Sequence, residues 1–328
     1  MSNITVSVVM VTYKHEQFIR AAVLSVIEQI GDFELELIVA DDLSPDHTPD
    51  IVNELIANHP YGYRIKYTRH TYNKGMMPNF IWALEQCKGK YVALCDGDDY
   101  WTDPYKLQKQ VDFLEKNPEY VITGHDVIFV DEHTKTIADS YLGREYKRDA
   151  SSEELKLGFL IPTLSMVFRA KPVLNEYVEK ASLVKNGDTF LTSLIGQYGK
   201  YNYMADVMGA YRKHQGGVWS MVNEFTQKRN NISTYTFLLS YYLQKGDVEI
   251  AKKIKERLSK DADALLFLAV KSGYSKFFRE AYLYYFKTEI GFFDFSKLIY
   301  LNKCLLFFLK NRYFKRLNTD IDSGKLPL

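Results

Sequence analysis

Short apolar runs alternate with helical patterns along the first hundred residues. Residues 6–11 form a nearly continuous apolar run, typical of a strand that is buried on both faces. Residues 16–29 then place apolar side chains at helical spacing. The alternation continues with strands predicted at 35–40, 65–68 and 91–95 and helices predicted at 50–58 and 79–87. This order predicts an α/β fold with βαβ units and a mainly parallel, Rossmann-like sheet flanked by helices.

Acidic residues follow two of the predicted strands. Such sheets bind ligands at the carboxyl ends of their strands, so these loops are the first candidates for function. Asp41 and Asp42 open one acidic segment, for which a solvated turn or a helix cap is an equally good interpretation. Residues 96–99 hold three carboxylates, which repel one another unless a cation lies among them. Hard oxygen ligands of this kind predict Mg²⁺ or Mn²⁺.

The composition excludes several classes of protein. Of 328 residues, 46% are apolar and 25% charged, which is typical of one large or two moderate globular domains and excludes disorder. The only cysteines are Cys87, Cys95 and Cys304, too few and too scattered for a disulfide framework or a zinc site. No P-loop or GxGxxG pattern, export signal or long apolar span is present, so we expect a cytoplasmic protein. The net charge of +1 gives no sign of a nucleic acid partner.

The near-neutral total conceals a split. Residues 1–224 hold 23 Lys+Arg and 31 Asp+Glu, a net charge of −8, whereas residues 225–328 hold 19 and 10, a net charge of +9. This asymmetry predicts two domains with different surroundings. The basic, aromatic C-terminal region is predicted to be helical at 230–244, 248–258, 262–271, 276–286 and 295–308.

The end of the C-terminal region has two interpretations. Residues 297–316 combine an apolar helix with lysines at both ends and in the middle, followed by basic residues beside aromatic ones. That composition is typical of an interfacial helix that contacts anionic lipid, which predicts peripheral attachment to the inner face of a membrane. A helical appendage that packs on the other domain or on a second copy in a homo-oligomer has the same composition.

Four linked segments carry a family resemblance. They are VSVVMVTYKHEQFI, ELIVADDLSPDHTPDIV, NKGMMPNFIWALEQCKGKYVALCDGDDYW and, further on, PTLSMVFR with GDTFLTSLIGQYGKYNYMADVMGAYRKHQGGVWS. Order, spacing and residue type resemble family 2 glycosyltransferases of the GT-A fold over roughly residues 4–220. The resemblance implies an inverting, metal-dependent transfer of a sugar from a nucleotide diphosphate donor, most often UDP-linked. The acceptor would be a hydroxyl of a glycan or a lipid-linked acceptor in bacterial cell-surface polysaccharide assembly.

The resemblance also implies a set of donor-binding residues. One of the acidic pair after the second strand reads the imide N–H of uracil in this family, and the loop after the first strand packs against the base. The residues that match the family's nucleotide site are Val11, Thr12, Tyr13, Asp41, Asp42, Asn73, Gly75, Asp96 and Gly97. Asp96-Gly97-Asp98 matches the family's DxD, so Asp98 is expected to hold the metal on the diphosphate.

Several roles stay open at this point. Asp96 would contact the ribose or the metal, and Asp99 is a further candidate ligand. His214 either completes the metal shell, as a late histidine does in many GT-A enzymes, or is structural. Arg212 and Lys213 are candidates to neutralise the phosphates.

The family resemblance implies that Asp188 is the proton acceptor. An attacking hydroxyl has a pKa far above neutrality, so transfer needs a positioned general base. Asp188 matches the family's base ahead of an apolar helix, although the same residue is also suited to N-cap a helix over 190–198.

The remaining candidates concern the acceptor and a lid. Thr163 and Ser165 are weak acceptor-binding candidates, and Gly216-Gly217 predicts a mobile loop that closes over the donor. Trp219 is suited either to stack on a sugar ring or to anchor the core. The other histidines lack ligand spacing and receive no role: His15, His47, His59, His70, His125 and His133.

Two other functions were weighed against this one. A sugar-nucleotide nucleotidyltransferase of related fold would carry a Gly-rich LxxGxGxR signature after the first strand, where this chain reads VTYKHEQF. A non-catalytic sugar- or nucleotide-binding module would have no need to retain Asp188 together with Asp96 and Asp98.

Overall fold

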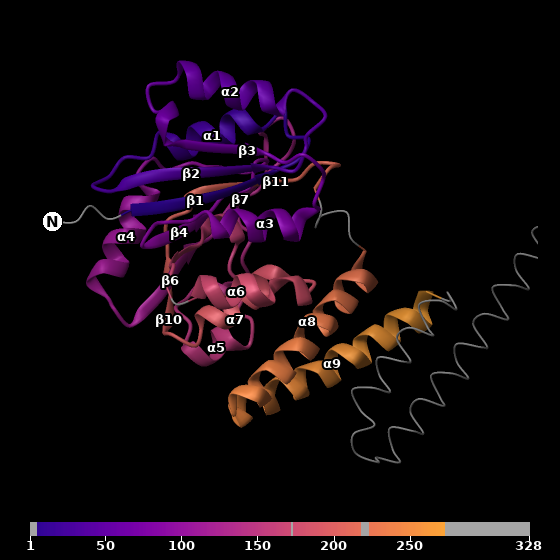
Figure 1. The fold of residues 1–328 in the computed structure, drawn as a ribbon. Helices are drawn as coiled ribbons and strands as arrows, with labels where there is room; N and C mark the ends of the chain where they lie inside the picture. The colour runs from indigo at the N-terminus through magenta and orange to yellow at the C-terminus, as the bar shows by residue number, and fades with distance from the viewer. Residues whose placement is uncertain (1–4, 172, 218–222, 273–328) are drawn as a thin grey trace, which may run out of the picture. The chain divides into compact units, whose positions relative to one another are not determined.

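A computed structural model describes residues 5–171, 173–217 and 223–272 (Figure 1). The chain divides into two compact units, Met1–Ser220 and Met221–Leu328, which are described separately below. The division falls at residue 220, close to the predicted domain boundary at residue 224.

A seven-stranded sheet forms the centre of the first unit, in the order β10-β6-β9-β4-β1-β2-β3. Its strands are β1 (Thr5–Thr12), β2 (Glu34–Asp41), β3 (Ile65–Arg69), β4 (Tyr91–Leu94), β6 (Tyr120–His125), β9 (Val167–Arg169) and β10 (Lys200–Met204). The neighbouring strands β4, β1, β2 and β3 pair in parallel, and β10 pairs in parallel with β6. β9 runs antiparallel to both of its neighbours, β4 and β6. The prediction of a mainly parallel sheet is therefore confirmed.

Helices cover both faces of this sheet. They are α1 (Ile19–Ile27), α2 (Thr48–Asn58), α3 (Met76–Glu85), α4 (Lys106–Lys116), α5 (Ser152–Lys156), α6 (Val173–Lys180) and α7 (Gly187–Ile195), with 3₁₀ turns η1 (Gly62–Arg64), η2 (Arg144–Tyr146), η3 (Thr163–Ser165) and η4 (Ala181–Leu183). In Figure 1, α1 and α2 lie on one side of the sheet and α3 on the other, where it contacts β1 and β2. Val8, Met10, Leu37 and Ala93 are fully buried in this core, as expected for central parallel strands.

A second, four-stranded sheet has the order β5-β11-β7-β8. It consists of β5 (Tyr100–Trp101), β7 (Ile128–Val130), β8 (Thr136–Ala138) and β11 (Gly209–Arg212). β11 pairs antiparallel with β5, which directly follows the acidic loop at 96–99. This pairing brings a late segment of the chain beside that loop.

The described part of the second unit is a pair of contacting helices, α8 (Glu224–Lys245) and α9 (Val248–Ser272). Gly246 ends α8 in the left-handed conformation, with φ 76°, which glycine adopts without strain.

The sequence reading of two helices at 248–258 and 262–271 is wrong, because α9 runs through both segments without a break. Residues 259–261 contain neither Gly nor Pro, and the stripe of buried side chains continues through Ala262 and Leu265. Among the helices that the structure describes, none combines the length and the apolar character that crossing a membrane requires. The helices predicted at 276–286 and 295–308 and the lipid-contacting segment 297–316 lie outside the described residues.

Candidate active site

The loop after β1 is anchored by the loop after β2. Three consecutive backbone N–H groups donate to side chains across this gap: Lys14 to Ser44 Oγ (3.0 Å), His15 to Thr48 Oγ1 (3.0 Å) and Glu16 to Asp46 Oδ2 (3.1 Å). Lys14 adopts a left-handed conformation with φ 61°, and the N–H groups of Phe18 and Ile19 donate to the carbonyl of His15. α1 consequently begins at Ile19 rather than near residue 16, and His15 is held in a tight turn at the end of β1.

Asp41 is buried at the end of β2. Its Oδ1 accepts from the Ser44 N–H at 2.8 Å, and its Oδ2 accepts from the Tyr67 hydroxyl at 2.7 Å. The carboxylate therefore shapes the loop in which Ser44 anchors Lys14. The expectation that it reads a base stays a prediction.

Asp42 connects the loop after β2 to the start of α3. Its two carboxylate oxygens accept from the backbone N–H groups of Lys74 (2.6 Å) and Gly75 (2.8 Å), while the Asn73 side chain donates to its carbonyl at 2.9 Å. Gly75 has φ 85°, a conformation that other residues rarely adopt. Asn73 and Gly75 thus act on Asp42, and no hydrogen bond places either of them on the acidic loop after β4.

The three carboxylates of the acidic loop lie together, with one oxygen of each within 4.8 Å of the others. Burial, with the nearby charge of Asp98, raises the pKa of Asp96 to about 7. The same causes, with Asp98 and Asp96 as the charges, raise the pKa of Asp99 well above its usual value. Burial acts in that direction on Asp98 too, but a hydrogen bond from His214 and the charge of His15 bring its pKa below the usual value. Asp98 is therefore the member of the group that ionises most readily.

Asp99 is tied to β11 by a hydrogen bond of 2.8 Å from the Arg212 N–H to its Oδ1. The Arg212 guanidinium is also committed: it donates to the carbonyls of Asp98 (2.9 Å) and Asp131 (3.0 Å) and to Thr134 Oγ1 (3.0 Å). Arg212 is only 4% exposed, so these bonds give it a bracing role, and its candidacy as a phosphate ligand stays a prediction. Lys213 Nζ lies 3.7 Å from the centre of the Phe129 ring.

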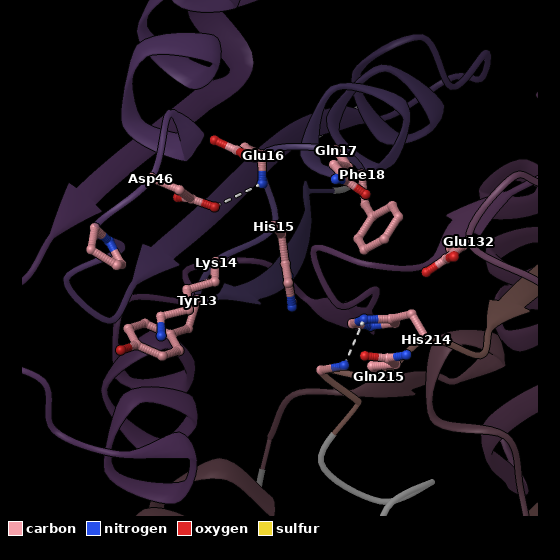
Figure 2. Close-up of a pocket in the computed structure, with 12 residues that line it drawn as sticks. Tyr13, Lys14, His15, Glu16, Gln17, Phe18, Asp46, Glu132, His214 and Gln215 are labelled. Atoms are coloured by element: carbon pink, nitrogen blue, oxygen red, sulfur yellow. Dashed lines mark hydrogen bonds between the residues drawn. The ribbon is translucent and has the colours of Figure 1, made fainter.

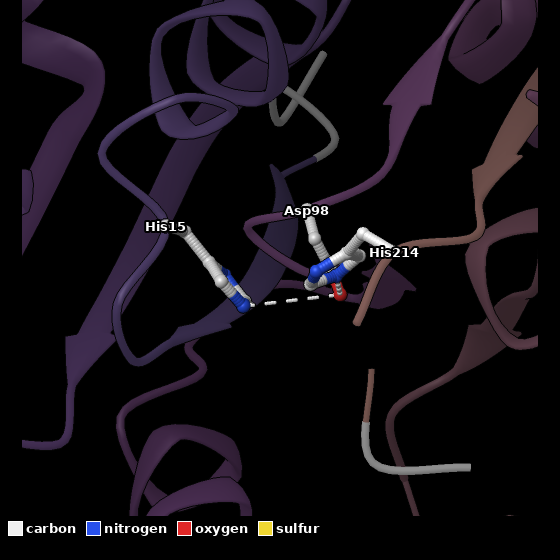
Figure 3. A group of neighbouring side chains, drawn as sticks. All are labelled: His15, Asp98 and His214. Atoms are coloured by element: carbon white, nitrogen blue, oxygen red, sulfur yellow. Dashed lines mark hydrogen bonds and ion pairs between the residues drawn. The ribbon is translucent and has the colours of Figure 1, made fainter. Parts of the chain in front are cut away.

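Two histidines converge on Asp98 (Figure 3). Nε2 of His214 lies 3.0 Å from Oδ2 of Asp98, and Nε2 of His15 lies 3.8 Å from the same oxygen. The two rings meet edge to face with centroids 6.0 Å apart. His15 thus belongs to the site, although the sequence interpretation assigned it no role. Its position in the loop after the first strand was the signal available, because this fold gathers ligand residues there.

Gly97 lets the β1 loop approach the acidic loop. A Cβ at this position would lie 2.8 Å from Thr12 Oγ1 and 3.0 Å from His15 Nδ1. The N–H of Gly97 also donates to the carbonyl of Val11 at 3.0 Å. The close approach explains why the middle residue of Asp-Gly-Asp is a glycine.

A pocket of about 850 Å³ opens beside this group (Figure 2). Its lining comes mainly from the loops after β1, β2 and β11: Tyr13, Lys14, His15, Glu16, Gln17, Phe18, Pro45, Asp46, Glu132, His214, Gln215 and Gly216. Tyr13 is 40% exposed, so its ring is available to a flat ligand. The volume is in the range of pockets that hold nucleotide-sized ligands.

Asp188 lies in the first turn of α7, which begins at Gly187 with Asn186 as its N-cap residue. The alternative interpretation, that Asp188 caps a helix over 190–198, is therefore wrong. Asp188 Oδ1 accepts from the Thr189 N–H at 2.7 Å. The residue is exposed at the surface, yet the surrounding protein strips hydration from its carboxylate and raises the pKa. Asp188 is not among the residues that line the 850 Å³ pocket.

The acceptor and lid candidates separate in the structure. Ser165 is fully buried and its hydroxyl donates to the carbonyl of Pro162 at 2.7 Å, so it does not face solvent, whereas Thr163 is half-buried. Gly216 lines the pocket, and its N–H donates to His214 Nδ1 at 3.2 Å, while the N–H of Gly217 donates to the carbonyl of His214. Trp219 lies outside the described residues.

The donor set around Asp98 fits a divalent cation. Two neighbouring ligands about 2.1 Å from an ion lie about 3.0 Å apart when they subtend a right angle, which matches the separation of Asp98 Oδ2 and His214 Nε2. Both residues are half-buried, so their ligand atoms are within reach of an ion. Asp98 and His214 are thus the residues suited to hold a metal.

Comparison with known proteins supports one family. The family model described as glycosyl transferase family 2 matches residues 7–171. Uncharacterized protein Rv1520 of Mycobacterium tuberculosis is 34% identical over 223 residues, which cover 68% of this chain and 62% of the relative. The chain therefore matches less than two thirds of the length of that relative.

Two further proteins are similar over part of their length. UDP-Glc:alpha-D-GlcNAc-diphosphoundecaprenol beta-1,3-glucosyltransferase WfaP of Escherichia coli is 34% identical over 110 residues, which are 34% of this chain and 41% of WfaP. The structure of S. aureus TarS 1–349 with UDP-GlcNAc superposes with a TM-score of 0.59 and 18% identity, over 76% of this chain and 71% of TarS. The TarS likeness shows the fold alone, which is the GT-A fold with a mainly parallel sheet.

Proposed function

Because the chain belongs to glycosyl transferase family 2, we propose that it moves one sugar from a nucleotide diphosphate donor to an acceptor hydroxyl, with inversion at the anomeric carbon. The observation that carries the proposal is the group of Asp98 and His214 at the carboxyl ends of the strands, beside a nucleotide-sized pocket. The donor in this proposal is a UDP-sugar. WfaP is named for UDP-Glc and the TarS structure contains UDP-GlcNAc, which supports the choice.

The nucleotide would lie in the 850 Å³ pocket. Tyr13 offers an exposed ring for the base, and Lys14 adds a positive charge near the phosphates. Asp41 or Asp42 is proposed to accept from the base N–H with a lone pair that its internal hydrogen bonds leave over. Val11 and Thr12 are the last two residues of β1, directly before Tyr13, and are assigned to the same nucleotide site.

The proposed cation is Mn²⁺ or Mg²⁺, held by Asp98 and His214 with Asp96 beside them. Such a cation neutralises the negative charge that builds on a departing diphosphate. Asp99 is assigned a positioning role, because its Oδ1 accepts from Arg212.

Asp188 is the proposed general base. Its carboxylate takes the proton of the acceptor hydroxyl while that oxygen bonds to the anomeric carbon. The bond from that carbon to the diphosphate breaks at the same time, and the nucleoside diphosphate leaves with the electron pair. The surroundings that raise the pKa of Asp188 make its carboxylate a stronger proton acceptor than an ordinary aspartate.

The proposed setting is the assembly of cell-surface polysaccharide on a glycan or a lipid-linked acceptor. WfaP is named for a diphosphoundecaprenol-linked acceptor, and the basic C-terminal region is suited to an anionic membrane surface. Peripheral attachment through residues 297–316 and self-association through the C-terminal region remain alternative proposals for that region.

The test is the release of nucleotide from a panel of nucleotide-sugars with Mn²⁺. Thermal shift first selects the donor, since a ligand of the folded state raises the melting temperature. Slow hydrolysis of that donor should then release UDP and an inverted free sugar, and Asp188→Asn should suppress both. If added pyrophosphate converts the donor to a nucleoside triphosphate and a sugar 1-phosphate, a nucleotidyltransferase is favoured instead, and binding with no turnover would favour a non-catalytic module.

A further inference from the structure

We propose that His15 is a third protein ligand of the cation that Asp98 and His214 hold. The resulting set of two imidazoles and one carboxylate selects Mn²⁺ over Mg²⁺ and binds it before a donor arrives. This inference rests on the proposed function, because it concerns the cation of the same site. One ligand atom from each of the three side chains lies within 4.8 Å of the other two.

The His15 ring has no hydrogen bond at either nitrogen among the described residues. Its Nδ1 is buried without a partner, and its Nε2 lies 3.8 Å from Asp98 Oδ2, which is too long for a hydrogen bond. The side chain is only 14% exposed, so water does not replace these bonds fully. A buried polar group without a partner is costly in a folded protein and requires an explanation. A cation bonded to Nε2 would not supply a partner for Nδ1. What supports a ligand role is that Nε2, the ring nitrogen nearest Asp98, makes no hydrogen bond to the described residues and is open to a cation.

The distances fit a shared ion. Ligands about 2.1 Å from a metal lie between about 3.0 Å apart, as neighbours, and about 4.2 Å apart, on opposite sides. The separations from Asp98 Oδ2 to the two Nε2 atoms, 3.0 Å and 3.8 Å, both fall in this range. Figure 3 shows the three side chains converging on one point from three different loops.

His15 is held in place before any ligand binds. Its backbone N–H donates to Thr48 Oγ1, and its carbonyl accepts from two N–H groups at the start of α1. Phe18 packs against the His214 ring, with centroids 4.8 Å apart, and lies 6.4 Å from the His15 ring. Because Gly97 has no Cβ, the acidic loop can approach His15 Nδ1 closely. Fixed ligands of this kind lose little entropy on binding a metal.

The ligand types determine which cation is favoured. Mg²⁺ prefers oxygen ligands and usually relies on one or two carboxylates with substrate phosphates. Imidazole suits first-row transition ions better than it suits Mg²⁺, and among those ions Mn²⁺ has a particular preference for carboxylate and other oxygen ligands. A site with a single imidazole would bind either ion mainly through the donor, whereas a site with two discriminates between them without it.

The experiment is a titration of the full-length, nucleotide-free protein with Mn²⁺, with free Mn²⁺ measured by electron paramagnetic resonance. We expect wild type to bind one Mn²⁺ that an excess of Mg²⁺ does not displace. His15→Ala should weaken the Mn²⁺ affinity about 10–100-fold. His133→Ala is the matched control, because the His133 side chain is 84% exposed and should leave the affinity unchanged.

Pulsed electron paramagnetic resonance of the bound Mn²⁺ counts the coordinated imidazoles directly. Coupling to two ¹⁴N nuclei is expected in wild type and to one in His15→Ala. If that variant fails to fold, the wild-type spectrum decides alone. Coupling to one nitrogen, an unchanged affinity in His15→Ala, or equal displacement by Mg²⁺ would each overturn the inference.

A lower UDP affinity in His15→Ala with unchanged Mn²⁺ binding would also overturn it, and would move the imidazole to a phosphate. None of these binding and resonance measurements requires the protein to transfer a sugar. A protein that binds Mn²⁺ through His15 without transferring sugar would therefore refute the proposed function alone.

Discussion

The backbone N–H of Arg212 donates a hydrogen bond of 2.8 Å to Oδ1 of Asp99, 113 residues earlier in the chain. Both side chains are buried, at 4% exposure each. The bond ties β11 to the acidic loop, and the chain leaving β11 then carries His214 to Asp98. This buried contact, with the guanidinium bond to the Asp98 carbonyl and the pairing of β11 with β5, joins the two segments that supply the candidate metal ligands.

Removing the Asp99 carboxylate should lower the stability of the fold, because the buried N–H of Arg212 would then have no hydrogen-bond acceptor. Asp99→Ala should reduce the free energy of unfolding by about 1–3 kcal/mol, because the buried Arg212 N–H loses its acceptor. Asp99→Asn keeps an oxygen in place and should stay close to wild type. Urea unfolding measures both, and equal losses in the two variants would contradict the hydrogen-bond explanation.

Asp98 should be indispensable for metal-dependent donor binding. Asp98→Ala removes the one carboxylate that both histidines approach, so Mn²⁺-stimulated UDP binding should disappear in calorimetry. Asp139→Ala changes an exposed aspartate and serves as the control. Metal-dependent UDP affinity that survives in Asp98→Ala would assign the cation to other residues.

Asp188 should act on the chemical step rather than on donor binding. Asp188→Asn retains the size of the side chain but cannot accept the proton, so transfer should fall about 10²–10⁴-fold. Donor affinity should remain close to wild type, because Asp188 does not line the 850 Å³ pocket. Turnover at the wild-type rate would place the base elsewhere.

Lys106 should make stability depend on pH above neutrality. Burial lowers its pKa from 10.5 to about 7, and its Nζ donates to Gln110 Oε1 at 2.7 Å. The unfolded chain therefore takes up a proton at higher pH than the folded protein does. The contribution of Lys106 therefore disfavours the folded state increasingly as the pH drops from 10.5 towards 7.

The substitution Lys106→Met should remove this pH dependence, since methionine fills similar volume without a titrating group. Lys66→Met, at an exposed position, should retain it. Urea unfolding between pH 7 and 10 provides the comparison. A slope in Lys106→Met equal to that of wild type would assign the effect to another group.

The C-terminal region should bind anionic membranes if its basic, aromatic end is an interfacial segment. The full-length protein should float with vesicles that contain anionic lipid and remain behind with neutral vesicles. Replacing Lys297, Lys303, Lys310 and Arg312 by Gln should weaken flotation, as should high salt, which screens surface charge. Binding that is equal at low and high salt would contradict the electrostatic explanation.

Local patterns in the sequence determined much of the catalytic unit. Apolar runs located β1, β2 and β4 because strands buried on both faces need mostly apolar residues. Their alternation with helices implied a parallel sheet, and that in turn implied one edge at which the residues after the strands gather. The mutual repulsion of the carboxylates at 96–99 indicated a cation site before any fold was known.

Contacts between distant segments decided the rest. His15 carries no spacing signal, because its place beside Asp98 depends on a left-handed Lys14 and on hydrogen bonds from the β1 loop to residues 44–48. The sequence makes Arg212 a candidate phosphate ligand, and only the fold shows that its guanidinium bonds to three groups in other loops. Periodicity along the chain describes only which face of an element is buried. The partner that each side chain meets is decided when β11 pairs with β5 and closes the site around Asp98.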